Sequence, residues 1–342
     1  MKKKNILVTG GLGFIGSNLV IELIKRNYFV IIVDKKTYSS NMMNINNINK
    51  KKYKLILSDI NNGEKILKIL NRFKPIAIFN LAAETHVDRS IDDPSSFIKS
   101  NINGVFQLLE QFKKFNRNNK KSKFLHISTD EVYGDIPKKK LSIETDPYNP
   151  SSPYAASKAA SDHLIKSYIR TYKLPIVITN CSNNYGPRQF PEKLIPKLIT
   201  NIINNKNLPI YGRGKNEREW IHVNDHCDAL IYIFKKGKVG ENYNIGSGEI
   251  VSNNIIANTI LKLCKKKLGK NNNSKIIYVK DRPGHDVRYA LNSKKLKKLG
   301  WKKKYNLTNG LNSTIEWYLN NFKWIKKLDK KNYINRLGVK KN

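Results

Sequence analysis

The sequence predicts an α/β protein with a doubly wound parallel sheet and a smaller C-terminal α/β lobe. Short continuous apolar runs alternate with helix-length segments through the first half of the chain. Runs of this length are typical of parallel strands that are buried on both faces. A glycine-rich turn directly after the first run is the second observation. The predicted strands are Asn5 to Thr9, Phe29 to Val33, Tyr53 to Leu57, Ile76 to Leu81, Lys123 to Ser128 and Pro175 to Asn180.

Helices are predicted between these strands, at 14–26, 63–71, 94–117 and 151–172. The last begins at Ser151, Ser152 and Pro153, where a serine can cap the helix and proline fits its first turn. After about residue 185 the pattern loosens into shorter elements, with one helix around Pro191 and Pro196. Further helical stretches are expected near 224–236, 251–268 and 306–321.

The chain has 342 residues, which at roughly 150 residues per domain suggests about two domains. We expect a first domain at 1–185, to which the segment of about 217–240 returns, and a second domain at 186–325. The lysine-rich segment 323–342 is weakly periodic, so we expect a frayed basic tail that occupies 326–342 in this division.

The composition disfavours a membrane protein and a disordered chain. Hydrophobic residues make up 39%, charged residues 26%, and the mean hydropathy is −0.53. The longest apolar runs are strand-sized and far shorter than a bilayer span. Met1 is followed by three lysines, but glycines interrupt the next apolar run, so we expect a cytosolic protein rather than an exported one. Cys181, Cys227 and Cys264 are odd in number and widely spaced, which argues against disulfides and a zinc site, and no metal is expected.

The net charge of +38 raises the question of a nucleic-acid partner. The charge is nearly all lysine, spread along the whole chain together with an excess of asparagine and isoleucine. An A+T-rich coding sequence produces that mixture, and the basic residues form no patch interleaved with aromatic residues that could stack bases. We therefore expect no nucleic-acid and no membrane partner, although the lysines would attract anionic substrates.

The turn from Thr9 to Gly16 carries four glycines between a predicted strand and a predicted helix. Glycine there permits a tight turn, a close approach of the backbone to a pyrophosphate, and close packing of helix on strand. Asp34 ends the second strand eighteen residues after Gly16, where a carboxylate can accept hydrogen bonds from a ribose 2′-hydroxyl and would repel a 2′-phosphate. The pattern predicts a Rossmann-type site for NAD rather than NADP. The alternative is a glycine-rich turn that binds no ligand.

Two further groups lie where predicted strands end, on the rim at which such sheets bind ligands. Asp59 and Ile60 follow the third strand, and Leu81, Ala82 and Ala83 follow the fourth. Either group is equally compatible with a simple turn at the end of a strand.

Tyr154 and Lys158 stand four residues apart near the start of the predicted 151–172 helix, which places them on one face. A lysine ammonium beside a phenol favours the phenolate and lowers its pKa from about 10. Asp130 and Glu131 begin where the fifth strand ends, and an adjacent acid pair at this rim suits general acid and base chemistry. A solvated loop with two incidental acids is the competing interpretation.

Taken together, these motifs resemble the extended short-chain dehydrogenase/reductase superfamily and, within it, the dTDP-glucose 4,6-dehydratase family over about residues 3–325. Ser128 to Gly134, with its Thr-Asp-Glu triplet, separates this family from the UDP-glucose 4-epimerases, which lack the acid pair. One departure is Glu219, where the family usually has aspartate. Another is a variable stretch after Lys270. The remaining matching stretches are Ala82 to Ser90, Thr179 to Pro187, Phe190 to Pro196, Pro209 to Gly212 and Asp281 to Asp286.

The resemblance implies an NAD-dependent lyase that acts on dTDP-glucose. Tyr154 would take the proton of the sugar 4-hydroxyl, Glu131 would remove the C5 proton, and Asp130 would protonate the departing 6-hydroxyl. Thr129 and Lys158 would hold the 4-oxygen and the ribose. The residues implied in NAD binding are Gly10, Gly13, Phe14, Ile15, Gly16, Asp34, Asp59, Ile60, Leu81, Ala82, Ala83, Ser100, Tyr154, Lys158 and Asn184. Those implied in substrate binding are Thr85, Thr129, Asn183, Glu192, Lys193, Leu194, Pro209, Tyr211, Arg218, Asn244, Asp281, Arg282 and His285, with Arg288 nearby in sequence.

Two alternatives remain at this point. One is another NAD-dependent nucleotide-sugar epimerase or dehydratase, because the choice of nucleotide base cannot be derived from these residues. The other is a non-catalytic protein that senses a nucleotide and binds nucleic acid, which the combination of Tyr154, Lys158, Asp130 and Glu131 disfavours. The resemblance also implies a homodimer formed by the helices at 94–117 and 151–172.

Overall fold

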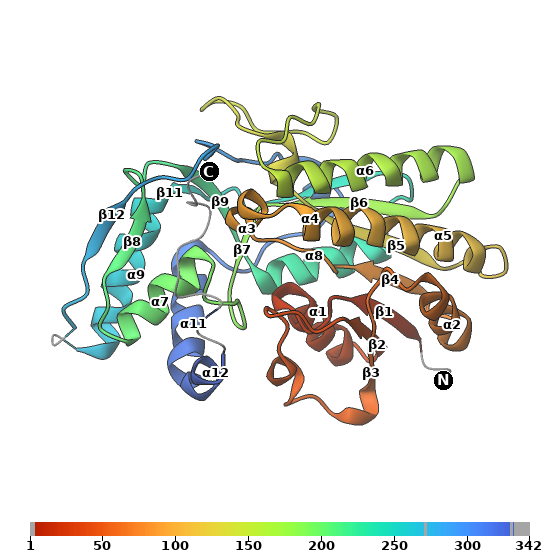
Figure 1. Ribbon diagram of the computed structural model, residues 1–342, viewed down its shortest axis with the longest axis horizontal. Helices are drawn as coiled ribbons and strands as arrows, with labels where there is room; N and C mark the ends of the chain where they lie inside the picture. The colour runs from red at the N-terminus through yellow and green to blue at the C-terminus, as the bar shows by residue number, and fades with distance from the viewer. Residues whose placement is uncertain (1–3, 270–271, 329–330, 332–342) are drawn as a thin grey trace.

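A seven-stranded parallel sheet forms the centre of the protein (Figure 1). The computed structural model describes residues 4–269, 272–328 and 331. The strands lie in the order β10-β6-β5-β4-β1-β2-β3, and each of the six predicted strands is present with its ends shifted by no more than one residue. Their bounds are β1 (Asn5–Thr9), β2 (Phe29–Asp34), β3 (Tyr53–Leu57), β4 (Ala77–Asn80), β5 (Lys123–Thr129), β6 (Ile176–Cys181) and β10 (Asn242–Ile245).

The sheet is doubly wound, as predicted, because β2 and β3 extend to one side of β1 and the later strands extend to the other. Alternate side chains of each strand enter different cores, so that Ile6 and Val8 pack on one face and Leu7 packs on the other. One face is covered by α1 (Phe14–Lys25) and α8 (Val223–Lys236). The opposite face is covered by α2 (Gly63–Phe73), α5 (Gly104–Asn116) and α6 (Pro153–Tyr172).

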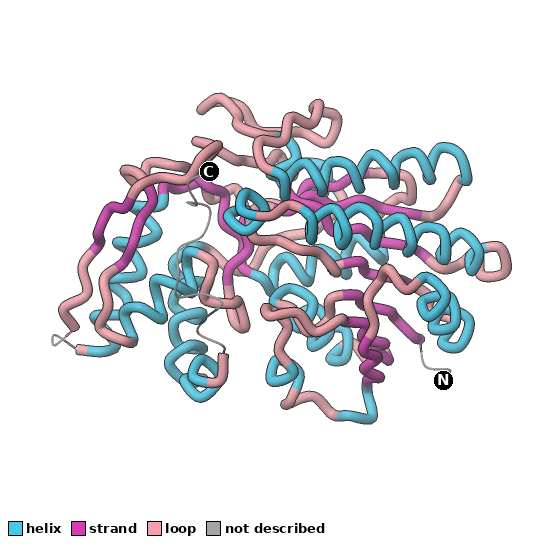
Figure 2. The backbone as a smooth tube through the Cα atoms, viewed as in Figure 1, coloured by secondary structure: helices cyan, strands magenta, loops and turns pink. Residues whose placement is uncertain are grey.

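Helix α6 begins as the sequence predicts. Ser152 Oγ accepts a hydrogen bond from the backbone N–H of Ala155 at 3.1 Å, and Pro153 occupies the first turn. The long loop between η4 (Asp130–Tyr133) and α6 extends above α6 in Figure 2.

The single helix predicted at 94–117 is interrupted. It consists of α4 (Ser95–Phe97), a π-helical segment η3 (Ile98–Asn103) and α5. The wider turn is held by side-chain contacts with other segments, since Asn101 Nδ2 donates to Ser157 Oγ at 2.9 Å and to the carbonyl of Glu84 at 3.0 Å. Periodicity alone does not reveal such an interruption, because a π-turn changes the helix by one residue.

The second lobe has its own core, in which three helices pack on one another and against strands of two smaller sheets. A three-stranded sheet β11-β9-β7 and a two-stranded sheet β12-β8 provide its strands. The elements are β7 (Asn183–Tyr185), α7 (Leu194–Ile203), β8 (Leu208–Tyr211), β9 (Glu217–His222), β11 (Ile250–Ser252), α9 (Asn253–Leu268), β12 (Ile276–Val279) and α11 (Leu307–Asn320).

The chain crosses between the two lobes more than once. α8 packs on α1, and β10 pairs with β6 in the large sheet, whereas β9 stays in the three-stranded sheet. We propose that the first domain consists of 1–185 with 223–245 returned to it, and that the second consists of the rest of 186–325. The remaining elements are η1 (Met42–Ile45), η2 (Lys50–Lys52), α3 (Val87–Asp92), α10 (Lys294–Lys298) and α12 (Phe322–Lys326).

The expectation of a frayed tail from residue 323 is wrong for its first residues. α12 is a short helix in which Trp324 and Ile325 are buried, and Leu328 is also buried. Trp324 Nε1 donates to Asn44 Oδ1 at 2.9 Å, and its ring packs against Trp317 and Tyr318. The lysines hide this contact in the sequence because they face solvent between the apolar residues. The rest of the expected tail, at 329–330 and 332–342, lies outside the described residues.

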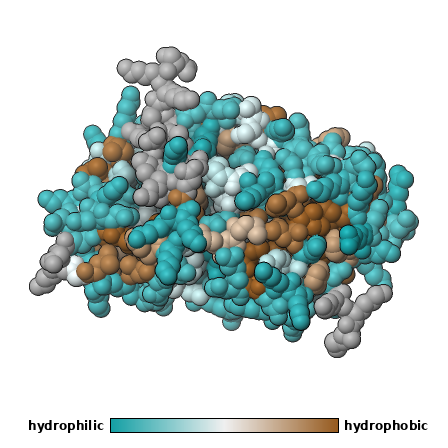
Figure 3. Space-filling view, turned by 60° about the horizontal axis from the view of Figure 1, so that its bottom comes forward, coloured by the Kyte–Doolittle hydropathy of each residue, from teal (hydrophilic) through white to brown (hydrophobic). Residues whose placement is uncertain are grey.

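The surface is mostly hydrophilic on the face shown in Figure 3, with apolar areas between the polar side chains. Within the described residues, no helix is both long enough and apolar enough to cross a membrane.

We expect Trp324→Ala to destabilise the fold by about 3 kcal/mol, because it removes a buried aromatic side chain and leaves Asn44 without its donor. Urea unfolding measures the change. Lys327→Ala, on the exposed side of the same segment, serves as the control and should change stability by less than about 0.5 kcal/mol. Equal stability of both variants would show that α12 does not support the core.

Candidate active site

A cavity runs along the carboxyl ends of the central strands, where a doubly wound sheet binds its ligands. Every residue that the sequence assigns to the cofactor lines this cavity, from the glycine turn to Asn184. Thr129, Asp130, Glu131, Tyr154 and Lys158 line it as well. The structure thus brings the predicted cofactor and catalytic groups to one place.

The glycine turn is shaped by two close backbone approaches. Gly10 has φ +66°, and a Cβ there would lie 2.8 Å from the backbone nitrogen of Ala82. A Cβ on Gly16 would lie 2.1 Å from the carbonyl oxygen of Gly10. No side chain caps α1, whose first turn lines the cavity, so its backbone N–H groups are available to an anion.

Asp34 is buried at the end of β2 and joins three segments. Its Oδ2 accepts from the N–H of Leu12 at 2.9 Å, and its Oδ1 accepts from the N–H of Lys36 at 2.7 Å and from Ser40 Oγ at 2.9 Å. An ionised carboxylate has about four acceptor sites, so one site remains for a ribose hydroxyl. The carboxylate faces the cavity and presents negative charge where the 2′-phosphate of NADP would have to lie.

Tyr154 and Lys158 both line the cavity, but their electrostatics differ from the sequence-based expectation. Burial raises the pKa of Tyr154 well above its usual value, nearby Glu131 and Cys181 raise it further, and hydrogen bonding by Thr129 opposes the shift. Lys158 Nζ donates to the carbonyl of Ile127 at 2.9 Å and to His126 Nε2 at 3.2 Å. Burial therefore outweighs the lowering of the phenol pKa that the sequence predicts from Lys158.

The two acids differ from each other in burial and in neighbours. Burial first, and then the charges of Glu131 and Glu219, raise the pKa of Asp130 well above its usual value. Burial also raises the pKa of Glu131, but Arg282, Lys193 and Arg218 oppose that shift. Asp130 Oδ2 is buried and has no hydrogen-bond partner among the described residues, whereas Thr129 Oγ1 donates to Asp130 Oδ1 at 3.2 Å. Asp130 is thus favoured as the protonated member of the pair and Glu131 as the ionised one.

A second cavity opens from the first toward the smaller lobe. The two cavities meet at Glu131. The residues that line both are Glu131, Asn183, Asn184, Gln189, Glu192 and Lys193. Four cationic side chains line the second cavity, which fits a ligand with a diphosphate group. These side chains are Lys193, Lys197, Arg218 and Arg282.

Protein groups already position three of these cations. Arg218 donates to the carbonyls of Glu217, Val287 and Asp286, and its guanidinium lies 4.3 Å from the centre of the Tyr289 ring. Lys193 Nζ donates to the carbonyl of Thr85 at 2.6 Å. Arg282 forms an ion pair with Asp88 at 2.6 Å, while its buried Nε has no hydrogen-bond partner in the part of the chain that the structure describes.

Most of the predicted substrate-binding residues line one of the two cavities. Asn244, Asp281 and Arg288 do not. Asn244 is buried in β10, where its side chain accepts from Tyr133 and donates to the carbonyl of Ser142. Asp281 accepts from His285 Nδ1 at 2.6 Å and so orients a residue that lines the second cavity. Residues that lie in or near the matched stretches therefore do not all line the ligand site.

Several residues that line the cavities are not predicted by the sequence motifs. They come from short loops and from the second lobe, where periodicity carries little information. His86 and Asp88 lie within the stretch that carries the resemblance, which was the available signal. The missed lining residues include Thr37, Ser39, Ser58, Gln189, Trp220, Asn253 and Tyr289.

Glu219, the departure from the family pattern, is fully buried and satisfied. Its Oε1 accepts from the N–H of Gly248 at 2.6 Å, and its Oε2 accepts from the N–H of Leu291 at 2.7 Å. A Cβ on Gly246 would lie 2.2 Å from Oε1, so that glycine makes room for the side chain. The extra methylene is accommodated without loss of a hydrogen bond to either oxygen.

The cavity fits a dinucleotide. The uncapped first turn of α1 suits a pyrophosphate, Asp34 has one acceptor site left for a ribose, and Lys158 faces the other end of the same cavity. A parallel sheet that carries a tyrosine–lysine helix beside such a turn is the architecture of the extended short-chain dehydrogenases/reductases.

Comparison with known proteins narrows this class. The family model for GDP-mannose 4,6 dehydratase matches residues 7–314. The probable dTDP-glucose 4,6-dehydratase of Sinorhizobium fredii is 46% identical over 98% of this chain and 98% of its own. The dTDP-glucose 4,6-dehydratase of Salmonella typhimurium is 45% identical over 94% of each chain.

Solved structures show the same relationship to the dTDP-glucose 4,6-dehydratases. The dTDP-glucose 4,6-dehydratase of Bacillus anthracis in complex with NAD superposes with a TM-score of 0.86 at 41% identity, over 95% of this chain and 100% of that one. The enzyme of Streptomyces venezuelae with NAD and TYD bound gives a TM-score of 0.88 at 38% identity, over 95% and 100%. This chain belongs to the NAD-dependent epimerase/dehydratase family of the extended short-chain dehydrogenases/reductases.

We expect Asp130→Asn to stabilise the fold, because a buried carboxylate with a raised pKa costs stability once the pH exceeds its unfolded value. The folded state binds the proton more tightly than the unfolded state, so wild-type stability falls as the pH rises from about 4 toward the folded pKa. The variant should be more stable by about 1 kcal/mol at pH 8, and the gain should shrink near pH 4. Urea unfolding at the two pH values tests this, and a gain that is equal at both would contradict the assigned protonation.

Proposed function

We propose that this protein converts dTDP-glucose into dTDP-4-keto-6-deoxyglucose and water. The observation that carries this proposal is the position of the acid pair. Asp130 and Glu131 follow β5 directly, line the cofactor cavity with Tyr154, and meet the cation-lined cavity through Glu131. A sugar bound between the two cavities is therefore near one phenol and two carboxyl groups with different protonation.

When bound, NAD⁺ accepts the hydride from sugar C4, returns it to C6 at the end, and brings a positive charge that favours the phenolate. Tyr154 takes the proton from the 4-hydroxyl during oxidation. Thr129 holds the 4-oxygen, and Lys158 orients the cofactor ribose while its ammonium is anchored by Ile127 and His126. The resulting 4-ketone acidifies the C5 hydrogen, which makes the following elimination possible.

Elimination of water needs one group that accepts a proton and one that donates a proton. Glu131 faces three cations and is assigned as the base that removes the C5 proton. Asp130 is more strongly favoured in its protonated form and is assigned as the acid that protonates the departing 6-hydroxyl. Water leaves as the C5–C6 double bond forms, and Glu131 gives its proton back to C5 when C6 is reduced.

The second cavity is assigned to the nucleotide diphosphate. Arg218 and Lys193 are already fixed by backbone carbonyls, so they lose little conformational entropy on binding an anion. Arg282 retains a buried Nε that can donate to a phosphate oxygen. Asn183, Glu192, Leu194, Pro209, Tyr211 and His285 form the surrounding wall together with Thr85 in the first cavity.

A sugar-nucleotide epimerase is the nearest competing function. The UDP-glucose 4-epimerase of Thermotoga maritima superposes with a TM-score of 0.83, but its identity of 31% is lower than that of the dehydratases named above. Epimerisation at C4 needs no group that removes the C5 proton or protonates a 6-hydroxyl. The buried acid pair therefore favours the dehydratase.

We also propose that the protein acts in the cytoplasm as a homodimer that pairs through α5, α6 and η3. Those elements adjoin one another, and Ile98, Phe106 and Tyr172 leave large apolar surfaces exposed on them. Sedimentation velocity should give a dimer for the wild type and a monomer for Phe106→Glu. A wild-type monomer at micromolar concentration would contradict this assembly.

The division of labour between Tyr154 and Glu131 can be tested by stopping the reaction halfway. Glu131→Gln keeps the size of the side chain but cannot remove the C5 proton. With dTDP-glucose in a single turnover, this variant should show the absorbance of reduced nicotinamide, persisting at least about 100-fold longer than in the wild type.

Tyr154→Phe is the matched variant and should show neither reduced cofactor nor product. The wild type should form product without net reduction of NAD. One reduced NAD per product in the wild type would identify a simple dehydrogenase. Turnover of Glu131→Gln at close to the wild-type rate would remove Glu131 from the role of base.

A further inference from the structure

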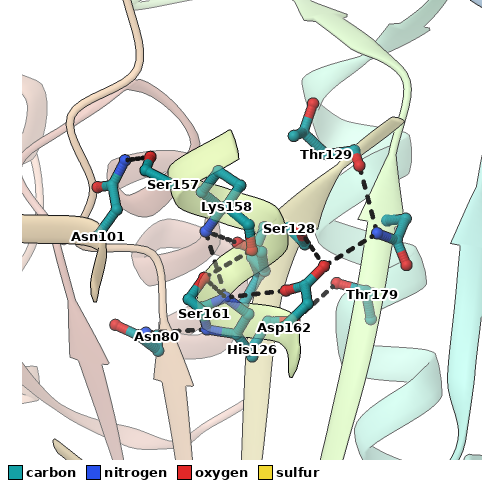
Figure 4. Close-up of polar contacts among 12 residues, drawn as sticks. Asn80, Asn101, His126, Ser128, Thr129, Ser157, Lys158, Ser161, Asp162 and Thr179 are labelled. Carbon is teal, nitrogen blue, oxygen red and sulfur yellow. Dashed lines mark hydrogen bonds and ion pairs between the residues drawn. The ribbon is translucent and has the colours of Figure 1, made fainter. Parts of the chain in front are cut away.

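A cluster of buried polar side chains lies beneath Lys158, and the reaction described above leaves two of its members without a role. His126 and Asp162 are both 0% exposed. They lie between β5 and α6 and join the groups drawn in Figure 4. A buried imidazole next to a buried carboxylate is costly unless both are satisfied, so this cluster calls for a physical account.

The cluster follows from two periodicities. His126 and Ser128 are two residues apart on β5 and therefore point to the same face of the strand. Tyr154, Lys158 and Asp162 are spaced by four on α6 and share one face of the helix. Asp162 therefore connects α6, which carries Tyr154 and Lys158, to β5, which ends at Thr129.

His126 is held on both sides of its ring. The side-chain amide of Asn80 lies 3.0 Å from Nδ1, and Nε2 faces Lys158 Nζ at 3.2 Å and Ser161 Oγ at 3.4 Å. Burial first, and the Lys158 charge second, lower the pKa of His126 well below its usual value. A neutral imidazole has one acceptor nitrogen, which a charged imidazolium lacks. Acceptance from the Lys158 ammonium at Nε2 places the ring proton on Nδ1, and the Asn80 amide then turns its oxygen toward Nδ1.

Asp162 bridges the helix and the strand end. Its Oδ2 accepts from Ser128 Oγ at 2.7 Å and from the hydroxyl of Tyr148 at 3.1 Å. The other oxygen, Oδ1, is buried, accepts no hydrogen bond from any described residue, and lies 3.4 Å from His126 Nε2. Asn180 Nδ2 contacts Oδ2 at 3.4 Å and also donates to the carbonyl of Thr129 at 3.2 Å. One carboxylate therefore fixes both the lysine helix and the start of the catalytic triplet.

We propose that His126 and Asp162 are positioning residues that hold Lys158 in its charged form and aim its remaining N–H at the cofactor. Two of the three ammonium protons are taken by the carbonyl of Ile127 and by His126. The third is free to point into the cavity that Lys158 lines. This inference rests on the proposed function for the identity of the cofactor, although the arrangement of the cluster does not.

The charges around Lys158 give the direction of the expected effect. Burial lowers the pKa of Lys158, whereas Asp162 and Cys181 raise it. Loss of the Asp162 charge should therefore lower the pKa of the ammonium further. The other groups that face the cluster are Tyr154 and Lys166 from α6, Tyr148 from the loop before it, His126 from β5 and Asp130 from η4.

The experiment measures NADH binding by fluorescence as a function of pH, together with kcat on dTDP-glucose. In Asp162→Asn, the pH at which NADH binding weakens should fall by about one unit, because a nearby opposite charge is lost. His126→Met should shift it in the same direction, since an acceptor of the charged form is lost. His126→Gln restores an acceptor and should return the pH at which NADH binding weakens toward the wild-type value. The pH above which kcat falls should shift in the same direction as the pH at which NADH binding weakens.

Asp225→Asn is the matched control. Asp225 is also a buried carboxylate on a helix that flanks the large sheet, where it accepts from the N–H groups of Lys304 and Tyr305. This control should leave the pH dependence of NADH binding unchanged. If Asp162→Asn does not fold, the two His126 variants decide the question.

A purely structural role would lower stability and reduce kcat by the same factor at every pH. That result, or an unchanged pH dependence of NADH binding in the folded variants, would overturn the inference. If the variants show the predicted pH shifts in NADH binding but the wild-type protein does not convert dTDP-glucose, the proposed function is refuted and the positioning role is supported.

Discussion

The burial of charge at the junction of β5 and α6 is the constraint on which the rest of the structure depends. Asp130, Lys158 and Asp162 are each at most 3% exposed, and all lie within this junction. Removing such groups from water is costly, so each must be compensated by a neighbour. The carbonyl of Ile127 and the neutral imidazole of His126 compensate Lys158. The hydroxyl of Ser128 and the side-chain amide of Asn180 compensate Asp162. Those compensating groups, in turn, fix the geometry of the catalytic side chains.

Desolvation also explains how two adjacent carboxyl groups can perform opposite tasks. Asp130 sits behind Glu131 with one oxygen unpaired, whereas Glu131 reaches the cation-lined cavity. Asp130 is the more deeply buried of the two, and three cations oppose the rise in the pKa of Glu131. The positive charges that would hold a diphosphate therefore also influence the proton that leaves C5. Binding and chemistry share one set of residues, which ties the rate of elimination to correct seating of the nucleotide.

The sequence predicted the first half of the protein closely because its signals are local. Buried parallel strands are continuous apolar runs, and Ser152 with Pro153 marks the start of α6. The cofactor side of the site could be predicted for the same reason, since the glycine turn and Asp34 each follow a strand. The π-turn at Ile98–Asn103 and the buried segment around Trp324 could not be predicted, because both depend on contacts with distant residues. The contact between His126 and Lys158 could not be predicted either, because it forms only when α6 packs on β5.

The hydrogen bond between Trp324 and Asn44 joins residues 280 positions apart. Asn44 Nδ2 also donates to the carbonyl of Leu12 at 2.9 Å, within the glycine turn, and Leu12 in turn donates its N–H to Asp34. A ribosome delivers the chain in order, so the turn is made long before the tryptophan that supports it. The nascent first domain therefore forms its glycine turn before α12, which braces that turn through Asn44, has emerged and docked.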